Sequence, residues 1–309
     1  MDLSVVIPLY NEAENIRPLY ERNAAVLPKL GTYEIIFVDD GSNDGTWQQI
    51  TALHRKDKHV RGMKLRRNFG QTAAMDAGFH AAQGKIIVAM DGDLQNDPAD
   101  IPRLLAEIGQ GYDVVSGWRY PRRDPLMKRF FSRGADKLRR WITGEKIHDS
   151  GCSLKAYRRE CFADLELYGE MHRFIPALLL WKGFKIGEIK VTHHPRLHGK
   201  SKYTITRLGK GFLDLLVVKF WMQYSARPIH LFGGLGLMTF FLGFLSGVYL
   251  TYQKFVLHQS IAGRPLLMLT VLLLVLGVQF IIFGLMSDIL IKVYFTGKNK
   301  SYSIEKIVG

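Results

Sequence analysis

Acidic and amide side chains follow three short apolar runs in the first hundred residues. The segments that follow these runs are Tyr10-Asn11-Glu12, Asp39-Asp40 and Asp91-Gly92-Asp93-Leu94-Gln95. Carboxylates that meet in one place repel each other unless a cation or a donor-rich ligand lies among them. Mg²⁺ prefers carboxylate and phosphate oxygens as ligands. The pattern therefore predicts a site for a divalent cation that bridges a diphosphate.

The elements around these segments must bring them together. Short apolar runs predict strands at 3–9, 34–38, 60–65, 85–90 and 112–116. Helices are predicted at 13–27 and 72–83, and another begins with Asp44 or Thr46 as its N-cap. Repeated βα units predict an α/β domain with a mostly parallel sheet and helices on both faces. Ligands bind beyond the carboxyl ends of such strands, which is where the acidic segments lie. A strand-terminal aspartate is often only an N-cap, and this alternative stays open for Asp40 and Asp44.

Other sequence features exclude several classes of protein. The chain has neither G-x-G-x-x-G after its first strand nor G-x-x-x-x-G-K-[ST], so neither a dinucleotide enzyme nor a P-loop NTPase is indicated. Cys152 and Cys161 are too few for a disulfide scaffold or a zinc site, and we expect reduced thiols. The net charge of +14 allows nucleic acid, anionic lipid or phosphorylated substrates as partners. His193-His194 show no ligand spacing with a third group, and we expect ordinary surface or core residues.

Three motifs resemble the inverting family 2 glycosyltransferases, which have the GT-A fold. The motifs are Val6-Ile7-Pro8-Leu9-Tyr10-Asn11-Glu12, Val38-Asp39-Asp40-Gly41-Ser42-Asn43-Asp44-Gly45-Thr46 and Met90-Asp91-Gly92-Asp93-Leu94-Gln95. Their order and spacing are most similar to the polyprenyl-phosphate branch. That branch includes dolichol-phosphate mannosyltransferases, bactoprenol glucosyltransferases and undecaprenyl-phosphate aminoarabinose transferases. The resemblance covers residues 3–206, and a two-helix tail is typical of the bacterial members.

The resemblance implies roles in binding the sugar donor. It implies that the nucleoside is held by Pro8, Tyr10, Asn11, Glu12, Asp39, Asp40 and Asn68. Asp39 would lie near the base. Asp91, Asp93 and Gln95 match the positions that carry Mg²⁺ or Mn²⁺ and the donor diphosphate, and the two aspartates are also expected to be catalytic.

A basic stretch begins at Arg119. Its cations are Arg119, Arg122, Arg123, Lys128, Arg129, Arg133, Lys137, Arg139, Arg140 and Lys146. A solvated face against anionic lipid explains some of these residues. Arginine also forms a planar, bidentate fork for phosphate oxygens, and similar enzymes use arginines at the positions of Arg119 and Arg133 for the acceptor phosphate. The segment 198–203 is similar to the family's Ser-Lys-Tyr segment, which places Lys202 near the phosphates.

Asp149 lies where this branch carries an aspartate before a small residue. It is either a general base or a group that orients an arginine, and we favour orientation. A phosphate monoester has a second pKa of about 6, so the acceptor is largely its own oxyanion nucleophile at neutral pH. The metal and the arginines then stabilise charge on the leaving diphosphate and on the attacking phosphate.

Two runs without charged residues lie near the C-terminus, at Leu231–Leu250 and Pro265–Ser287. Each is long enough to span a bilayer as a helix, and no amphipathic segment remains to bury them as core helices. The loop Gln253–Arg264 makes them a hairpin whose outer ends lie on one side. Lysine and arginine are more frequent in the flanks than in the loop, so the positive-inside rule places the N-terminal domain and the tail in the cytoplasm.

The segment Tyr203–Tyr224 alternates apolar and basic residues at roughly helical spacing. This pattern favours an amphipathic helix in the headgroup plane, with an ordinary surface helix as the alternative. The expected divisions are a cytoplasmic GT-A catalytic domain (1–202), an interfacial region (203–228), a transmembrane hairpin (229–295) and a cytoplasmic tail (296–309).

Together these features predict an integral hexosyltransferase of the cytoplasmic membrane that serves cell-envelope glycosylation. It would move one sugar, with glucose as first choice, from a UDP-sugar to polyprenyl (undecaprenyl) phosphate with inversion. The alternatives are a mannosyltransferase that uses GDP-mannose and an aminoarabinose-type transferase. A processive polysaccharide synthase is more remote, since Lys137-Leu138-Arg139-Arg140-Trp141 lacks the glutamine of Gln-x-x-Arg-Trp. A non-catalytic scaffold and a nucleic-acid binder rank lower. Similar enzymes can form homo-oligomers, and the sequence leaves this open.

Overall fold

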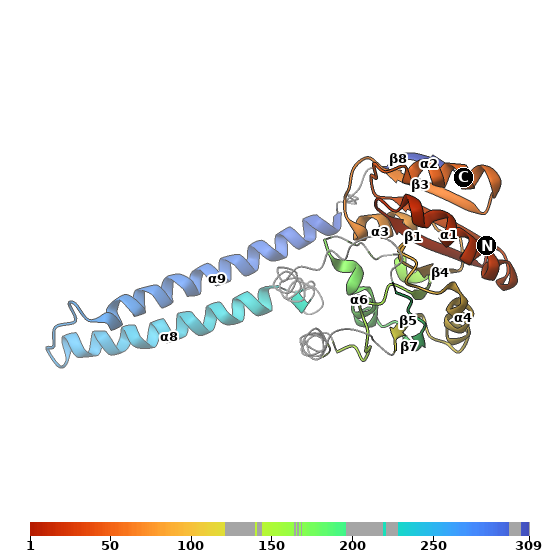
Figure 1. The fold of residues 1–309 in the computed structure, drawn as a ribbon. Coiled ribbons are helices and arrows are strands. Elements are labelled where there is room, and N and C mark those ends of the chain that lie inside the picture. Colours follow the sequence, from red (N-terminus) through yellow and green to blue (C-terminus); the bar gives the residue numbers. More distant parts are fainter. Residues whose placement is uncertain are drawn as a thin grey trace. The chain divides into compact units, whose positions relative to one another are not determined.

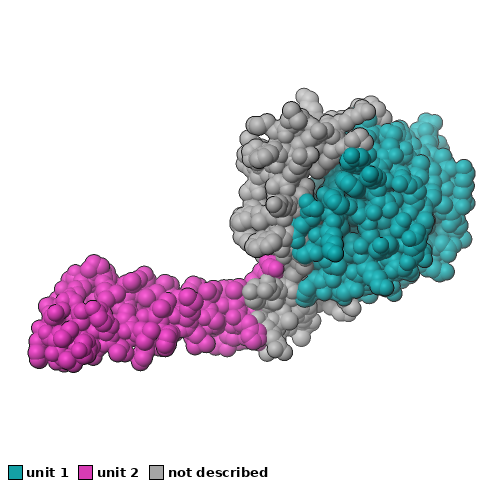
Figure 2. All heavy atoms as spheres, turned by 90° about the horizontal axis from the view of Figure 1, so that it is seen from below, with its two compact units in different colours: residues 1–218, 300–309 teal, residues 219–299 magenta. Residues whose placement is uncertain are grey.

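The chain divides into two compact units (Figure 2). The α/β unit comprises residues 1–218 and 300–309, and the hairpin unit comprises residues 219–299. The computed structural model describes residues 1–120, 140, 144–163, 165, 167, 169–195, 219–220, 228–296 and 304–308. The chain thus leaves the α/β unit for the hairpin unit and then returns to it.

One mixed sheet forms the centre of the α/β unit (Figure 1). Its strands lie in the order β7-β5-β6-β4-β1-β2-β3-β8. Their bounds are β1 Leu3–Leu9, β2 Tyr33–Asp39, β3 Val60–Leu65, β4 Ile86–Ala89, β5 Val114–Arg119, β6 Lys155–Arg158, β7 Ile186–Val191 and β8 Ile304–Val308. The four strands β3, β2, β1 and β4 run parallel, as do β5 and β7, whereas β6 and β8 are antiparallel to their neighbours. The predicted α/β fold with a mostly parallel sheet is confirmed.

All five strands expected from the sequence are present, with small differences at their ends. The three strands that the sequence did not reveal are β6, β7 and β8. They lack a continuous apolar run, because β6 begins with Lys155 and ends with Arg158, and β7 is only partly buried along most of its length. Apolar periodicity alone therefore found the strands with continuous apolar runs and missed those interrupted by charged or partly exposed residues.

Helices cover both faces of the sheet. The helices are α1 Ala13–Val26, α2 Thr46–Lys56, α3 Gln71–Ala81, α4 Ile101–Gly109 and α6 Ile175–Trp181 in the α/β unit, with short 3₁₀ turns η1 Leu27–Leu30, η2 Pro98–Asp100, η3 Arg159–Phe162 and η4 Met171–Arg173. Alternate residues of a strand point to opposite faces. Val5 and Ile7 of β1 share one apolar cluster with residues of α1, α2 and α4. Val6 instead contacts α3, so α3 covers the opposite face.

Helix α3 approaches the sheet closely at Gly78. A Cβ at this position would come within 2.3 Å of Val6 Cγ1 and 3.1 Å of Val38 Cγ2. Because Val6 and Val38 are fully buried, neither can move aside freely. Gly78 therefore allows α3 to lie close enough for its first turn to reach the carboxyl ends of β1 and β2.

The strand β8 extends the sheet beyond β3. It runs antiparallel to β3, with Val308 opposite Gly62 and Ile307 opposite Met63. Part of the segment 296–309, expected to be a tail, is thus a strand of the α/β unit. Both ends of the hairpin unit are consequently linked to the same unit.

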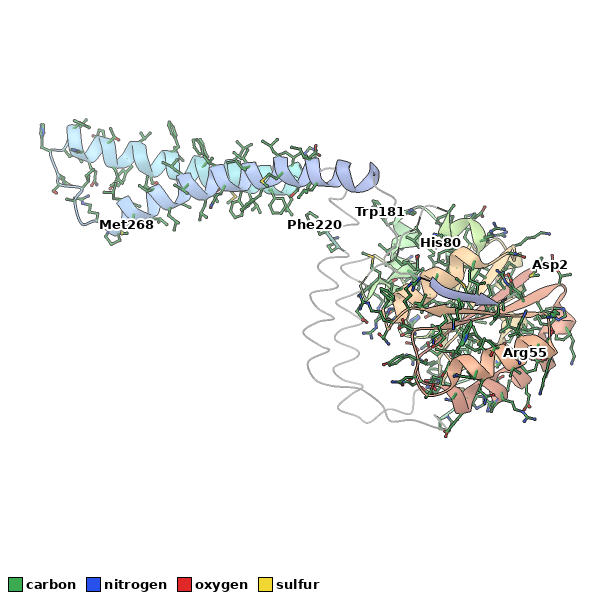
Figure 3. The ribbon with its side chains drawn as sticks, turned by 90° about the horizontal axis from the view of Figure 1, so that it is seen from above. Asp2, Arg55, His80, Trp181, Phe220 and Met268 are labelled. Atoms are coloured by element: carbon green, nitrogen blue, oxygen red, sulfur yellow. The ribbon has the colours of Figure 1, made fainter. Side chains whose placement is uncertain are left out.

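The hairpin unit contains α8 (Ile229–Phe255) and α9 (Pro265–Thr296). Both helices are long and apolar enough to cross a membrane, and only 17% and 11% of their most apolar windows are buried. Apolar side chains project outward along both helices, and Met268 is 78% exposed (Figure 3). Such exposure does not suit core helices and is expected for helices surrounded by lipid.

Small residues bring α8 and α9 together. A Cβ at Gly236 would come within 2.7 Å of the Gly277 carbonyl oxygen, and one at Gly243 within 3.0 Å of Leu274. Thr270 Oγ1 donates to Ser246 Oγ at 2.9 Å across the pair. Close approach at small residues with interhelical hydrogen bonds is typical of helices packed in lipid. The predicted interfacial helix 203–224 falls outside the described residues, apart from 219–220.

The packing of α3 gives a test of the fold. Gly78→Ala should lower the free energy of unfolding by about 1–3 kcal/mol, because overpacking a filled core forces strain. The measurement is thermal melting of the full chain in detergent. Gly109→Ala is the matched control, since a Cβ at this helical glycine meets no atom within 4 Å. Equal melting temperatures for the two variants would contradict the close packing of α3 on β1 and β2.

Candidate active site

The three acidic segments lie together at the carboxyl edge of the sheet. They follow β4, β1 and β2, which are consecutive in the strand order. The Asn11 N–H donates to Ser42 Oγ at 2.9 Å, and Asn11 Oδ1 accepts from the Asn43 N–H at 3.1 Å. A Cβ at Gly92 would come within 2.3 Å of Leu9. The segment after β1 therefore touches the segment after β2, and the last residue of β1 touches the segment after β4.

Asp40 holds the loop after β3 against the loop after β2. Its Oδ1 accepts from the Phe69 N–H at 2.7 Å, and its Oδ2 accepts from the Gly70 N–H at 2.9 Å. Burial raises the pKa of Asp40, while these two N–H groups oppose the rise. Gly41 has a φ of +71°, and a Cβ there would come within 2.4 Å of the backbone of the loop after β3. The loop that carries Asn68 is thereby fixed in place.

Helix α2 begins at Thr46 with Gly45 as its N-cap residue, at a φ of +95°. The sequence predicted Asp44 or Thr46 as the N-cap of this helix, and that prediction is wrong. The alternative that Asp40 is an N-cap is also wrong, because Gly70 is the N-cap residue of α3. Asp44 still supplies an acceptor, because its Oδ1 receives the Thr46 N–H at 3.0 Å. Its Oδ2 accepts from the Ala13 N–H at 3.1 Å, which joins the starts of α1 and α2.

Asp39 lies fully buried at the end of β2. Its Oδ1 accepts from the Ser42 N–H at 2.9 Å, and Oδ2 has no hydrogen-bond partner among the described residues. An unpaired buried carboxylate oxygen is costly, so the N–H of a ligand is expected there. Pro8, Tyr10 and Glu12 lie at the neighbouring end of β1, and Tyr10 is 39% exposed. The arrangement suits a flat, polar group such as a nucleobase.

Asp91 and Asp93 lie close together after β4. Asp93 is buried, and its Oδ1 accepts from the Gln95 N–H at 3.2 Å. Asp91 is partly exposed, and its Oδ1 accepts from Gln71 Nε2 at 2.8 Å. Burial raises the pKa of Asp91, and the negative charge of Asp93 raises it further.

The backbone of this loop is held in a rarely used conformation. Leu94, between Asp93 and Gln95, has a φ of +63° and is buried. A left-handed conformation is uncommon for a residue with a branched side chain. The Leu94 carbonyl oxygen accepts from Arg22 Nη1 at 3.1 Å, which helps to hold the turn. The turn places Asp93 and Gln95 beyond the carboxyl end of β4.

The carboxylate pair suits a nucleotide-bound divalent cation. Among the described residues, no three His, Cys, Asp or Glu side chains lie close enough to hold a metal by themselves. Mg²⁺ in nucleotide sites is usually bound by one or two carboxylates, with phosphate oxygens and water supplying the rest. Asp91 and Asp93 provide that number of carboxylates, and Gln95 lies beside them.

The two histidines that the sequence presented as ordinary lie beside this loop. His193 forms a β-bridge with Asn96, and its Nε2 lies 3.4 Å from Gln95 Nε2. The His194 N–H donates to the Gln95 carbonyl oxygen at 2.9 Å, and His194 Nε2 lies 2.9 Å from Asp97 Oδ2. Their position beside the acidic loop could not be read from the sequence, because nearly a hundred residues of chain separate them from it.

Arg119 and Asp149 form a bidentate ion pair at the carboxyl end of β5. Arg119 Nε donates to Asp149 Oδ2 at 2.7 Å, and Nη2 donates to Oδ1 at 2.8 Å. The Arg119 backbone N–H also donates to Oδ2, at 3.2 Å. Burial lowers the pKa of Arg119, but the Asp149 carboxylate outweighs this effect and raises it. The guanidinium is thus permanently charged and fixed in direction.

The Arg119–Asp149 ion pair lies near the carboxylate pair. The negative charge of Asp91 helps to raise the pKa of Arg119, and Arg119 in turn lowers that of Asp91. The structure therefore brings Asp91, Asp93, Gln95, Arg119 and Asp149 together. Two other predicted site residues, Arg133 and Lys202, fall outside the described residues.

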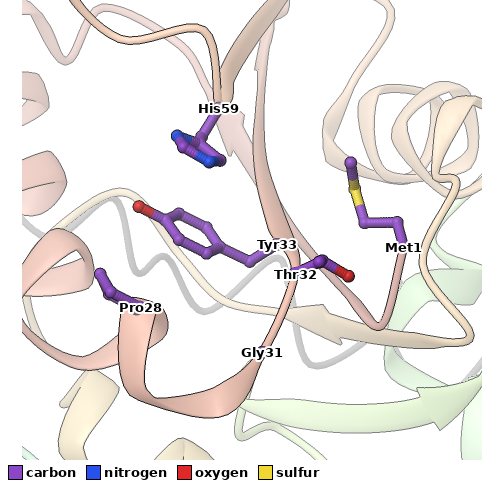
Figure 4. Close-up of a pocket in the computed structure, with 6 residues that line it drawn as sticks. All are labelled: Met1, Pro28, Gly31, Thr32, Tyr33 and His59. Atoms are coloured by element: carbon purple, nitrogen blue, oxygen red, sulfur yellow. The ribbon is translucent and has the colours of Figure 1, made fainter.

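A separate hollow lies at the opposite end of the strands (Figure 4). Its lining residues are Met1, Pro28, Gly31, Thr32, Tyr33 and His59. These residues precede β1, β2 and β3 or begin them, so the hollow lies at the amino edge of the sheet. Ligands of open α/β sheets bind at the carboxyl edge, and the hollow is therefore not the site described here.

Comparisons with known proteins decide the family. The profile described as "Glycosyl transferase family 2" matches residues 4–166. The chain is also 45% identical over 301 residues to the "Dodecaprenyl-phosphate galacturonate synthase" of Rhizobium johnstonii, covering 96% of this chain and 89% of the relative. The chain belongs to glycosyltransferase family 2. This family 2 glycosyltransferase is also 35% identical to the "Undecaprenyl-phosphate 4-deoxy-4-formamido-L-arabinose transferase" of Yersinia pestis, covering 99% of the chain and 94% of the relative.

Solved structures share the fold of this family 2 glycosyltransferase. Glucosyl-3-phosphoglycerate synthase from Mycobacterium tuberculosis, in complex with Mn²⁺, UDP-glucose and phosphoglyceric acid, has a TM-score of 0.55 and 19% identity. The match covers 72% of this chain and 79% of that one. The same enzyme in complex with Mn²⁺ and UDP-glucose has a TM-score of 0.53 and 20% identity, covering 71% and 78%. The GT-A fold implied by the three motifs is thereby confirmed.

The neighbouring aspartates Asp39 and Asp40 provide a matched pair of tests. Asp39→Asn should weaken UDP binding about tenfold or more, because the amide that replaces Oδ2 offers a donor where a ligand N–H needs an acceptor. Asp40→Asn should instead lower the melting temperature, because one of its two backbone N–H partners loses its acceptor. Calorimetric titration with UDP and Mn²⁺, together with thermal melting, measures both effects. If Asp39→Asn lowered the melting temperature and Asp40→Asn weakened UDP binding, Asp39 would be structural.

Proposed function

We propose that this chain is an integral membrane enzyme that transfers one sugar from a nucleotide-sugar to a polyprenyl phosphate. The observation that carries the proposal is the meeting of opposite charges at one edge of the sheet. Asp91 and Asp93 form the negative part, and Arg119 held by Asp149 forms the positive part. The first suits a cation-bound diphosphate and the second suits a free phosphate, so the site fits a donor and an acceptor that are both anionic.

The donor binds across the ends of β1, β2 and β4 in this proposal. Asp39 and the residues after β1 hold the nucleoside, and Asp91, Asp93 and Gln95 hold Mg²⁺ or Mn²⁺ on the diphosphate. When bound, the cation stabilises negative charge on the leaving diphosphate. The proposed cation and uridine nucleotide are the groups that glucosyl-3-phosphoglycerate synthase, which shares the fold, holds in its complexes with Mn²⁺ and UDP-glucose.

The acceptor phosphate binds at Arg119, with Arg133 and Lys202 as further predicted contacts. An ionised phosphate oxygen attacks the anomeric carbon, the bond to the diphosphate breaks, and the configuration inverts. Both oxygens of Asp149 accept bonds from Arg119, so Asp149 acts by orienting the guanidinium and not as a base. No base is needed, because a phosphate monoester with a second pKa of about 6 is already ionised at neutral pH.

The membrane position follows from the hairpin unit. Helices α8 and α9 cross the membrane of a bacterial cell, and both ends of the pair connect to the α/β unit. The excess of lysine and arginine outside the Gln253–Arg264 loop supports a cytoplasmic position for that unit. The catalytic domain 1–202, the interfacial region 203–228 and the hairpin 229–295 remain our proposed divisions, and residues 304–308 join the catalytic domain as β8.

For the sugar, the comparisons do not confirm glucose. The two relatives act on galacturonate and on 4-deoxy-4-formamido-L-arabinose, so the aminoarabinose-type alternative lies closer to them than glucose does. We propose galacturonate as the sugar, because the galacturonate synthase has the higher identity over nearly the whole chain.

A donor screen tests this proposal. The full chain in nanodiscs is incubated with Mn²⁺, undecaprenyl or dodecaprenyl phosphate and one labelled donor: UDP-galacturonate, UDP-4-formamido-arabinose, UDP-glucose or GDP-mannose. The expected result is a lipid-linked galacturonate. Another lipid-linked sugar would overturn the choice of galacturonate while retaining the reaction. The absence of any lipid-linked product would overturn the proposed function.

The roles of Arg119 and Asp149 give a kinetic prediction. Arg119→Lys should raise the KM for polyprenyl phosphate about tenfold or more with little change in UDP affinity, because lysine lacks the bidentate fork. Asp149→Asn should also raise this KM, and the pH profile of kcat should keep its shape. Steady-state kinetics between pH 6 and pH 9 provide the measurement. Loss of an acidic limb from the kcat profile of Asp149→Asn would show that Asp149 is a base.

A further inference from the structure

Lys155, the first residue of β6, is a buried cation that the reaction above does not use. Its exposed fraction is 3%, and lysine is rarely buried without partners. Its Nζ donates to the Ser150 carbonyl oxygen at 3.0 Å and to the Cys152 carbonyl oxygen. Burial lowers the pKa of Lys155, whereas the nearby charges of Asp149 and Asp91 raise it. The Lys155 side chain thus holds two carbonyl groups of one turn.

That turn, residues 149–152, is the backbone on which the Arg119–Asp149 pair lies. The Cys152 N–H donates to the Asp149 carbonyl oxygen at 3.3 Å, which closes the turn. A Cβ at Gly151 would come within 3.2 Å of Arg119 Nη2 and 3.6 Å of Asp149 Oδ1. The glycine thus lets the backbone pack directly on both charged groups. A shift of this turn would move the guanidinium.

Glu188 of β7 holds the other side of the same turn. Its Oε1 accepts from the His148 N–H at 2.8 Å and from the Asp149 N–H at 3.0 Å. Its Oε2 lies 2.7 Å from His148 Nδ1. A cation therefore holds the carbonyl groups of the segment 148–152 while an anion holds its N–H groups. The two groups come from β6 and β7, which are separate strands of the same sheet.

We propose that Lys155 and Glu188 are positioning residues that clamp the segment 148–152 and so fix the Arg119 guanidinium for the acceptor phosphate. The inference rests on the proposed function, because it assigns the acceptor to Arg119. Asp149 engages Nε and Nη2 of Arg119, so among the described residues the remaining nitrogen, Nη1, is left for a ligand. A phosphate at Nη1 is held well only if Asp149 stays in place.

A buried ion pair elsewhere provides the matched control. Arg61 Nη1 lies 2.6 Å from Glu34 Oε2, and Glu34 is buried. Glu34 also accepts from the Gln83 N–H at 2.7 Å, so this pair orders backbone much as Lys155 does. It lies near the amino ends of β2 and β3, at the opposite edge of the sheet. Loss of Arg61 should therefore reduce stability without changing acceptor use.

The experiment compares Lys155→Met, Glu188→Ala, Glu188→Gln and Arg61→Met in the full chain in nanodiscs. The measured quantities are the melting temperature, the Kd of UDP with Mn²⁺, and KM and kcat for polyprenyl phosphate. Lys155→Met and Glu188→Ala should raise the acceptor KM about tenfold, while the Kd of UDP changes less than about threefold. Glu188→Gln keeps an acceptor oxygen and should retain most of the wild-type KM. Arg61→Met should lower only the melting temperature.

An unchanged acceptor KM in Lys155→Met or in Glu188→Ala would overturn the inference. If Lys155→Met lowered only the melting temperature, as Arg61→Met should, Lys155 would have a structural role alone, and this result would also overturn the inference. If Lys155→Met does not fold, Glu188→Ala decides the question, because Glu188 lies at the less buried side of the segment. A wild-type chain that forms no lipid-linked sugar would overturn the proposed function itself, whereas an active wild type with unaffected variants would overturn this inference alone.

Discussion

Burial of the Asp91 carboxylate beside a second carboxylate, Asp93, is the constraint on which the site depends. Burial raises the pKa of Asp91, and the negative charge of the neighbouring Asp93 raises it further. The fold keeps them there nonetheless: Gly92 packs against Leu9, and Leu94 is held in a left-handed conformation. Strained backbone of this kind persists where the surrounding structure holds it, and it is often found at active sites and ligand-binding loops. A divalent cation with a diphosphate is the ligand that suits this pair.

The opposite charge on the other side of the site makes the chemistry workable. Donor and acceptor are both anionic, so a site with carboxylates alone would repel the acceptor. Arg119 supplies positive charge within reach of Asp91, and Asp149 fixes its direction. Lys155 and Glu188 hold the backbone beneath that pair. Charges of alternating sign thus continue from the carboxylate loop into the sheet.

The sequence was most informative where a short local pattern was enough to predict a strand or the position of an acidic segment. Continuous apolar runs located the buried strands such as β1 and β2, and the acidic segments after them identified the carboxyl edge. Contacts over long stretches of chain were not predictable, because no local signal connects Lys155 or Glu188 to Arg119, or His193 to Gln95. Asp40 shows a further limit, since its residue type agreed with a ligand-binding role while the structure uses both oxygens to hold the loop before α3. The strand β8 was missed because its pairing with β3 requires the chain to return from the hairpin unit.

The central claim is that the carboxylate pair binds the donor through a divalent cation. Its most direct test is the Kd of UDP for the full chain, measured by calorimetric titration with Mn²⁺ and again with EDTA. UDP should bind the wild-type chain about a hundredfold more weakly in EDTA than with Mn²⁺. In Asp93→Asn the Kd of UDP should be the same under both conditions. Equal affinity with and without the cation in the wild-type chain would contradict the claim.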